Sequence, residues 1–300
     1  MSIKVKHLTK YYGSQTAVNN ISFEAKKGEI LGFLGPNGAG KSTTMKIITG
    51  FIPASSGNVE VCGLDVEKNA LESRTKIGYL PENNPLYLDM YVKEYLEFVA
   101  KIYKVKNRKA RVNDMIEQVG LEREQHKLIG ALSKGYRQRV GLAQAIIHEP
   151  EVLILDEPTS GLDPNQLVEI RALIKNIGKE KTVMLSTHIM QEVEAICDRV
   201  IIIKNGNLVA NDTATTLQQK GEQTVVYVEF EGKVSKNQLQ KIEGVNKIEA
   251  VGNGTFLIAS KTNADLRKTI AQFAQQNNLL TLTLRKEERS LEDVFKELTK

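Results

Sequence analysis

A glycine-rich segment at residues 35–43, GPNGAGKST, ends in a lysine and two hydroxyl residues. It has the spacing GxxxxGK followed by Ser or Thr, and the apolar run 29–35 that leads into it is typical of a buried strand. Glycines let backbone N–H groups surround phosphate oxygens, and a helix starting near Lys41 adds its positive N-terminus. The spacing predicts a phosphate-binding loop, whereas a ligand-free glycine turn would match pattern and context only by chance.

In such a loop, Lys41 reaches the β- and γ-phosphates, and the Ser42 hydroxyl is positioned for Mg²⁺. The residues expected to surround the phosphates are Gly35, Pro36, Asn37, Gly38, Ala39, Gly40, Lys41, Ser42 and Thr43.

Two carboxylates, Asp156 and Glu157, end a second apolar run, VLILDE at 152–157. Beside a phosphate loop, Asp156 is expected to hold Mg²⁺ through water, and Glu157 to orient and polarise the attacking water. The alternative is a solvated acidic turn ahead of Pro158. The phosphate-binding loop favours the catalytic interpretation.

His188 ends a third buried run, TVMLSTH at 182–188. A lone histidine at a strand end is more often a hydrogen-bonded structural residue than a catalytic one. Open α/β sheets, however, bind ligands at the carboxyl ends of their strands. We therefore interpret His188 as a sensor of the γ-phosphate.

These runs belong to a region, 1–220, in which short apolar strands alternate with amphipathic helical patterns. The alternation predicts an α/β domain with a mostly parallel sheet covered by helices. The first 25 residues alternate like antiparallel strands and predict a smaller β-layer. Helical spacing at 93–105 and 109–121 predicts a helical subdomain over about 83–148.

Residues 221–300 have a different pattern, with segments in the order β-α-β-β-α-β. That order predicts a small ferredoxin-like α+β domain. A helix is expected over 235–245, and a second one is expected to begin at Asn263 as its N-cap. We find no cluster of catalytic residue types in this region.

Composition limits the function further. The net charge is only +5, from 41 basic and 36 acidic residues among 300, which predicts no nucleic-acid partner. The cysteines, Cys62 and Cys197, lack CxxC spacing and favour a reducing compartment. The N-terminus has no apolar run of a signal peptide, and no segment approaches the roughly 20 apolar residues that span a bilayer. Any membrane role is therefore expected to act through a partner.

Further motifs carry a family resemblance. LSKGYRQ at 132–138 resembles the signature motif of ABC ATPases, and it precedes the carboxylate-ending strand as in that family. The segment 160–163, SGLD, resembles the family's D-loop, and His188 its switch histidine. Tyr12 matches the aromatic residue that stacks on adenine, although one of Tyr11 and Tyr12 is expected to pack in the strand. The resemblance covers residues 2 to about 230.

The resemblance implies a P-loop NTPase fold with a RecA-like core that uses ATP and Mg²⁺. It also implies a head-to-tail dimer in which Ser133 and Gly135 contact the ATP held by the other subunit's loop. Whether the second ATPase is another copy of this chain stays open. A separate membrane permease is expected to dock on the loop 82–91, which places the protein peripherally on the cytoplasmic face of the inner membrane. The signature and the extra domain resemble exporters of drugs or polysaccharides, and 81–100 looks closest to the ATP-binding subunit of the gliding-motility exporter.

Two positions depart from the family pattern. Lys134 replaces the first glycine of the usual LSGGQ, either adding positive charge near phosphate or serving as an exposed solubilising lysine. Glu82 stands where the family usually has the glutamine that contacts Mg²⁺. A carboxylate also binds hard cations, so Glu82 is expected to be a metal ligand.

Three alternatives compete with a transport ATPase. A soluble ABC ATPase acting on a macromolecular complex usually has two ATPase modules or a coiled-coil insertion. A P-loop kinase or GTPase has no use for the signature, and the nearest NKxD-like segment, 246–249, lies in the other domain. The third alternative is a non-catalytic regulatory subunit. The retention of four catalytic residue types argues against it: Lys41, Asp156, Glu157 and His188.

Overall fold

The computed structural model describes residues 1–219, 224–232, 234–261, 264–287 and 290–299. These residues form two compact units, one containing Met1–Ala214 and the other Thr215–Leu298. Asn263, the expected helix cap, lies outside the described residues. No helix among the described residues is both long enough and apolar enough to cross a membrane.

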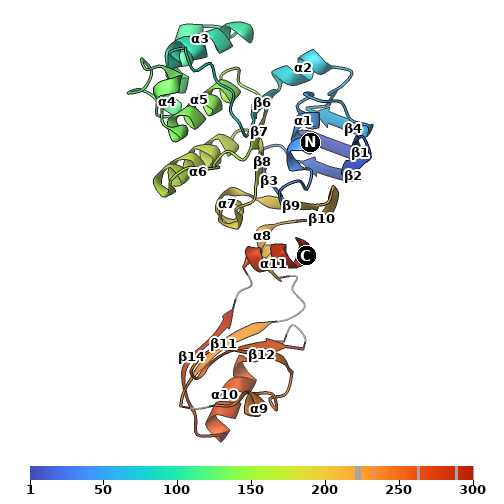
Figure 1. Ribbon diagram of the computed structural model, residues 1–300, viewed down its shortest axis with the longest axis vertical. Helices are drawn as coiled ribbons and strands as arrows, with labels where there is room; N and C mark the ends of the chain where they lie inside the picture. The colour runs from blue at the N-terminus through green and yellow to red at the C-terminus, as the bar shows by residue number, and fades with distance from the viewer. Residues whose placement is uncertain (220–223, 233, 262–263, 288–289, 300) are drawn as a thin grey trace. The chain divides into compact units, whose positions relative to one another are not determined.

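A six-stranded sheet forms the centre of the first unit, in the order β10-β9-β3-β8-β7-β6 (Figure 1). All neighbours are parallel except β10, which pairs antiparallel with β9 at one edge. Every residue of β3, β7 and β8 is buried, as expected of aliphatic strands covered on both faces. The predicted mostly parallel sheet is confirmed. Its strands are β3 (Ile30–Leu34), β6 (Ile77–Leu80), β7 (Val152–Asp156), β8 (Thr182–Thr187), β9 (Arg199–Lys204) and β10 (Asn207–Asp212).

A second, antiparallel sheet has the order β2-β1-β4-β5, which confirms the predicted β-layer. Its strands are β1 (Ile3–Tyr12), β2 (Gln15–Ala25), β4 (Ser56–Val61) and β5 (Leu64–Asp65). The expectation that either Tyr11 or Tyr12 packs in the strand is wrong, because their side chains are 52% and 48% exposed. The register of β1 against β2 shifts between Lys10 and Tyr11, and this interrupts the alternation of buried and exposed side chains.

Successive residues of the central strands face two separate cores. Leu153 and Leu155 of β7 pack with residues of the helices, whereas Val152 and Ile154 pack with α1 and the antiparallel sheet. Figure 1 shows α3 to α6 on one side of the central sheet and α1 on the other. The helical segments are α1 (Lys41–Ile48), α2 (Ala70–Thr75), α3 (Val92–Ile102), α4 (Arg108–Gln118), the 3₁₀ turn η1 (Ile129–Ala131), α5 (Lys134–Ile146), α6 (Pro164–Gly178) and α7 (Met190–Ile196).

The second unit contains a four-stranded antiparallel sheet in the order β12-β13-β11-β14. One face of β11 and β13 packs on α9 and α10 through residues such as Val228, Ile258 and Ile270. The helix expected over 235–245 is shorter, because after Leu239 the backbone N–H groups of Lys241 and Ile242 bond to the third preceding carbonyl and form turns, which still bury Ile242. The elements from residue 214 onward are α8 (Ala214–Gln219), β11 (Val225–Glu231), α9 (Lys236–Leu239), β12 (Val245–Gly252), β13 (Thr255–Ser260), α10 (Arg267–Gln276), β14 (Leu280–Glu287) and α11 (Leu291–Thr299).

The register of three parallel strands decides where the functional residues meet. β8 lies between β3 and β7, with Leu34 opposite Thr187 and Asp156 opposite Ser186. The carboxyl ends of the three strands therefore lie side by side. This edge carries the glycine-rich loop, the two carboxylates and His188.

Candidate functional site

The glycine-rich loop connects the end of β3 to α1, and two of its glycines have conformations that disfavour other residues. Gly38 has φ +78° and Gly40 has φ +108°. A Cβ atom on Gly40 would lie 2.5 Å from the carbonyl oxygen of Ala17. Gly40 is the N-cap of α1 and provides no side-chain cap, so the first N–H groups of this helix remain available to a ligand.

Lys41, the first residue of α1, has a side chain that is only 6% exposed. Its Nζ donates hydrogen bonds to the carbonyl oxygens of Gly35 at 2.7 Å and Pro36 at 3.3 Å, and it lies 3.9 Å from Glu157 Oε1. Burial lowers the pKa of Lys41, and the nearby carboxylates oppose that shift. A buried ammonium group with mostly neutral partners is a strong attractor for an anion.

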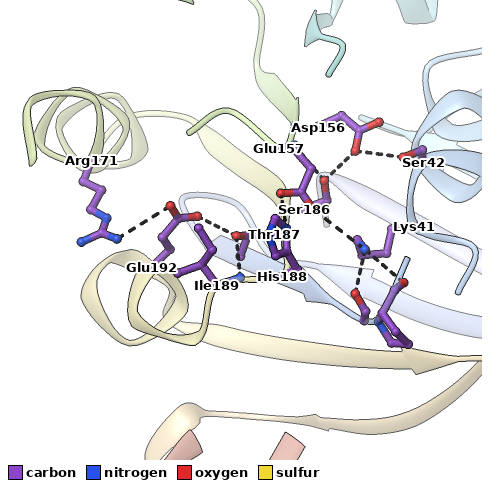
Figure 2. Close-up of polar contacts among 12 residues, drawn as sticks. Lys41, Ser42, Asp156, Glu157, Arg171, Ser186, Thr187, His188, Ile189 and Glu192 are labelled. Carbon is purple, nitrogen blue, oxygen red and sulfur yellow. Dashed lines mark hydrogen bonds and ion pairs between the residues drawn. The ribbon is translucent and has the colours of Figure 1, made fainter. Parts of the chain in front are cut away.

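Asp156 ends β7 and is connected to two hydroxyl groups (Figure 2). Its Oδ1 accepts hydrogen bonds from Ser186 Oγ at 2.6 Å and from Ser42 Oγ at 3.1 Å. Carboxylate and hydroxyl oxygens suit a hard divalent cation. No group of three or more His, Cys, Asp or Glu residues that could hold a metal occurs in the described part of the chain. Asp156 and Ser42 together fill only part of the octahedral set of oxygens that Mg²⁺ takes, which leaves positions for water, a further carboxylate or a bound phosphate.

Glu157 is held in an unusual backbone conformation, with φ +50° in the left-handed region. Its N–H donates to Ser186 Oγ at 2.9 Å, and its Oε2 lies 2.9 Å from His188 Nδ1. Burial raises the pKa of Glu157, while His188 and Lys41 act in the opposite direction. Strain of this kind persists where the surroundings determine the conformation, and it often occurs at functional sites.

A cavity of about 560 Å³ joins most of these groups. Tyr12 and Glu82 lie on it together with Lys41, Glu157 and His188. The predicted residues Gly35, Pro36 and Ala39 belong to the loop, and Asp156 lies behind Ser42, but none of these four lines the cavity itself. The lining residues are Tyr12, Gln15, Ala17, Asn37, Gly38, Gly40, Lys41, Ser42, Thr43, Glu82, Glu157, Ser160 and His188.

The segment resembling the signature motif lies elsewhere, because Ser133 and Gly135 do not line this cavity. Ser133 is the exposed N-cap of α5, and its Oγ accepts a hydrogen bond from the N–H of Tyr136 at 3.4 Å. Gly135 packs against α6, where a Cβ atom would lie 2.5 Å from Cδ of Gln166. The chain thus does not bring this segment to its own glycine-rich loop.

Ser186 is a site residue that the sequence analysis missed. It is fully buried, donates to Asp156, and accepts from the backbone of Glu157, so it fixes both carboxylate-bearing residues. The available signal was a serine beside Thr187 at the end of the buried run 182–187. That signal became meaningful only once β8 was seen beside β7.

The chain is similar to known proteins along nearly its whole length. Residues 18–160 match the family model described as ABC transporter. The bacitracin transport ATP-binding protein BcrA of Bacillus licheniformis is 36% identical over 301 aligned positions, which cover 99% of this chain and 96% of that relative. The linearmycin resistance ATP-binding protein LnrL of Bacillus subtilis strain 168 is 38% identical over 234 residues, 77% of this chain and 75% of the relative.

A solved structure is similar in fold as well as in sequence. A dimeric bacterial ABC transporter cassette matches with a TM-score of 0.65 and 28% identity, over 70% of this chain and 98% of that chain.

Proposed function

The chain belongs to the family of ABC transporter ATP-binding proteins, and we propose that its 560 Å³ cavity holds Mg-ATP as the nucleotide site of a transport ATPase. Proteins of this family hydrolyse ATP, and this chain is therefore an ATPase. One observation carries the assignment of the site: the ammonium group of Lys41 and the strained, buried Glu157 meet in one cavity, 3.9 Å apart.

In this proposal, the loop binds the phosphates. The N–H groups near Gly38 and Gly40 surround the phosphate oxygens, and Lys41 exchanges its bonds to Gly35 and Pro36 for bonds to the β- and γ-phosphates. The exposed ring of Tyr12 lies on the same cavity and offers a face for the adenine.

Glu157 is the proposed base, since its carboxylate faces the cavity and can accept a proton from the attacking water. His188 Nδ1 is bonded to Glu157, which leaves Nε2 as the nitrogen that can contact the γ-phosphate. Because Ser186 fixes the backbone of Glu157, the carboxylate is oriented before the nucleotide arrives.

Ser42 and Asp156, joined by Glu82, would hold Mg²⁺. The ion would neutralise charge on the β- and γ-phosphates. Glu82 is exposed and lines the same cavity as Ser42, which supports its role as a further oxygen ligand.

The head-to-tail dimer is part of the proposal. The exposed N-terminus of α5, with Ser133 as its cap, can contact a phosphate held by another subunit but not the one in its own cavity. The similarity to a dimeric ABC transporter cassette supports a dimer.

A separate permease is the proposed membrane partner, which would place the chain peripherally at the cytoplasmic face of the membrane. In the loop 82–91, Leu86 is buried, whereas Tyr87 and Tyr91 are 57% and 50% exposed. Large exposed aromatic side chains around an apolar anchor suit a protein interface. Names of the two relatives, for bacitracin transport and linearmycin resistance, support the drug-export branch. The gliding-motility assignment stays a prediction.

For the second unit we propose a ferredoxin-like fold. Its element order β11-α9-β12-β13-α10-β14 and its strand order β12-β13-β11-β14 support this assignment. The similarity to BcrA extends over 99% of the chain and so includes this unit.

The test is the Glu157→Gln variant of the full chain. It should bind ATP as the parent does, and its kcat should fall by about 100-fold or more, because general-base catalysis contributes about 10²–10⁴-fold. Its mass in solution should change from monomer to dimer only with Mg-ATP. A parent-like rate would refute the assignment of the base, and an ATP-bound monomer would refute self-pairing. A pull-down with the full chain that recovers ribosomes or DNA but no membrane protein would favour the alternative, a soluble ABC ATPase that acts on a macromolecular complex.

A further inference from the structure

A buried carboxylate holds the segment that carries His188. Glu192 of α7 is 1% exposed, and its Oε2 accepts a hydrogen bond from Thr187 Oγ1 at 2.6 Å. Thr187 Oγ1 in turn accepts the N–H of Ile189 at 3.1 Å. Figure 2 shows these contacts on the residues immediately before and after His188. The Glu192 carboxylate is therefore connected to Thr187 directly and to Ile189 through Thr187, on either side of His188.

The other oxygen of Glu192 faces a different helix. Oε1 lies 3.7 Å from Nη2 of Arg171 on α6, an ion pair longer than a hydrogen bond. Oε1 and Arg171 Nε are both buried, and neither has a hydrogen-bond partner within the described residues. Buried ionic groups are normally fully hydrogen-bonded, so this pair is incompletely satisfied and sensitive to small shifts of α6.

α6 is also attached to the helix that begins at the signature-like motif. Gln166 packs against Gly135, and Glu169 forms an ion pair with Arg139 of α5. Arg171 lies on the same helix, at most two turns beyond Gln166. α6 thus contacts α5 through its first turns and the His188 segment through Arg171.

We propose that Glu192 is a positioning residue for ATP hydrolysis: its carboxylate fixes the His188 segment through Thr187, and its ion pair with Arg171 connects that segment to α6. This inference rests on the role proposed for His188. A purely structural ion pair is the competing interpretation, and it predicts a loss of stability without a specific change in kcat.

The experiment measures kcat, KM for ATP and the melting temperature of full-length variants. Thr187→Val should lower kcat about tenfold, the size expected for one lost hydrogen bond to a charged group. Glu192→Gln keeps an oxygen that can accept from Thr187 but removes its charge, so it should lower kcat about fivefold; KM should stay within about twofold of the parent in both variants. Thr187→Ser keeps the hydroxyl and should restore kcat. Thr187→Val and Thr187→Ser keep the inference testable if Glu192→Gln fails to fold.

The matched control is Glu29→Gln. Glu29 is a 9% exposed carboxylate paired with Arg199 at 2.6 Å, and it precedes β3 at the end opposite the glycine-rich loop. This variant should lower the melting temperature while leaving kcat within about twofold of the parent. A similar loss of kcat in the control would show that losing any buried ion pair has this effect, and would overturn the inference.

A double-variant cycle tests whether Glu192 acts through His188. Glu192→Gln should cause no further loss of kcat in a His188→Ala background, because the group being positioned is already absent. Fully additive losses would overturn the inference. A parent-like kcat for His188→Ala would refute the proposed role of His188, whereas a parent-like kcat for Glu192→Gln and Thr187→Val alone would overturn only the role of Glu192.

The link to α6 has its own test. Arg171→Met leaves the Glu192 carboxylate buried without its cation, so it should lower both the melting temperature and kcat. Adding Glu192→Gln removes the unpaired charge and should raise the melting temperature above that of Arg171→Met alone. Additive effects of the two substitutions on both quantities would remove α6 from the inference.

Discussion

Two helices of the first unit begin at motifs associated with phosphate, and their N-termini differ. α1 begins inside a cavity after Gly40, has no side-chain cap, and starts with the buried cation Lys41. α5 begins on the surface, and Ser133 caps its own helix. The first N-terminus has the charge and enclosure of a complete anion site. The second has only the helix end and a hydroxyl, which suits half of a site that a partner completes.

The largest expected effect tests the complete site. Lys41→Ala should weaken ATP binding by about 100-fold, because charge-assisted hydrogen bonds contribute about 1.5–3 kcal/mol each. Equilibrium titration with a fluorescent ATP analogue measures this. Lys181→Ala is the control, since its half-buried Nζ also donates to a backbone carbonyl, of Pro150, but lies outside the cavity. Unchanged affinity in the Lys41 variant would remove the difference between the two helix ends.

A pH profile should separate the two ends further. Burial raises the pKa of Glu157 above its ordinary value of 4.5, and the base must be ionised to act. The rate constant kcat should therefore fall as the pH decreases through this raised pKa, up to about tenfold per pH unit on the acid side. Ser133→Ala should keep this acid limb. If the pH profile of the parent protein has no acid limb, the assignment of Glu157 as the base is contradicted.

A substitution at the N-terminus of α5 should change dimerisation and leave ATP binding by the monomer nearly unchanged. Ser133→Ala should weaken the ATP-dependent dimer about tenfold, the size of one hydrogen bond to a charged group, while monomer affinity for ATP changes less than about twofold. Sedimentation with and without Mg-ATP measures the fractions of monomer and dimer, and the ATP titration described above measures the affinity of the monomer. Ser235→Ala removes a comparable capping hydroxyl in the second unit and should leave dimerisation unchanged. A Ser133 variant that binds ATP more weakly as a monomer would mean that the segment serves its own cavity.

The smallest effect concerns the adenine. Tyr12→Ala should weaken ATP binding about fivefold, because aromatic stacking contributes about 0.5–1.5 kcal/mol, and Tyr12→Phe should restore it. Tyr11→Ala is a close control, since Tyr11 is equally exposed but does not line the cavity. Equal losses at both positions would contradict the choice of Tyr12.

Much of the fold could be predicted because its signals are local. The aliphatic runs of β3, β7 and β8 identified buried strands, and the spacing of glycines at the start of α1 identified the loop. The error in the helix expected over 235–245 was also local in origin, since its apolar spacing continues through turns. Apolar side chains in turns can be buried as well as those in a helix, so periodicity alone could not place the end of α9.

The sequence by itself determined which residues could do chemistry here: a glycine loop for phosphates, a lysine, two carboxylates and a histidine at the ends of buried runs. Only the tertiary structure decided that β8 lies between β3 and β7, so that Ser186 bonds the carboxylate of Asp156 and the backbone of Glu157, and Glu192 holds the segment of His188. It also decided that both Tyr11 and Tyr12 are exposed. Glycine conformation and side-chain periodicity are properties of neighbouring residues, whereas strand order and buried ion pairs arise from packing between segments far apart in the chain.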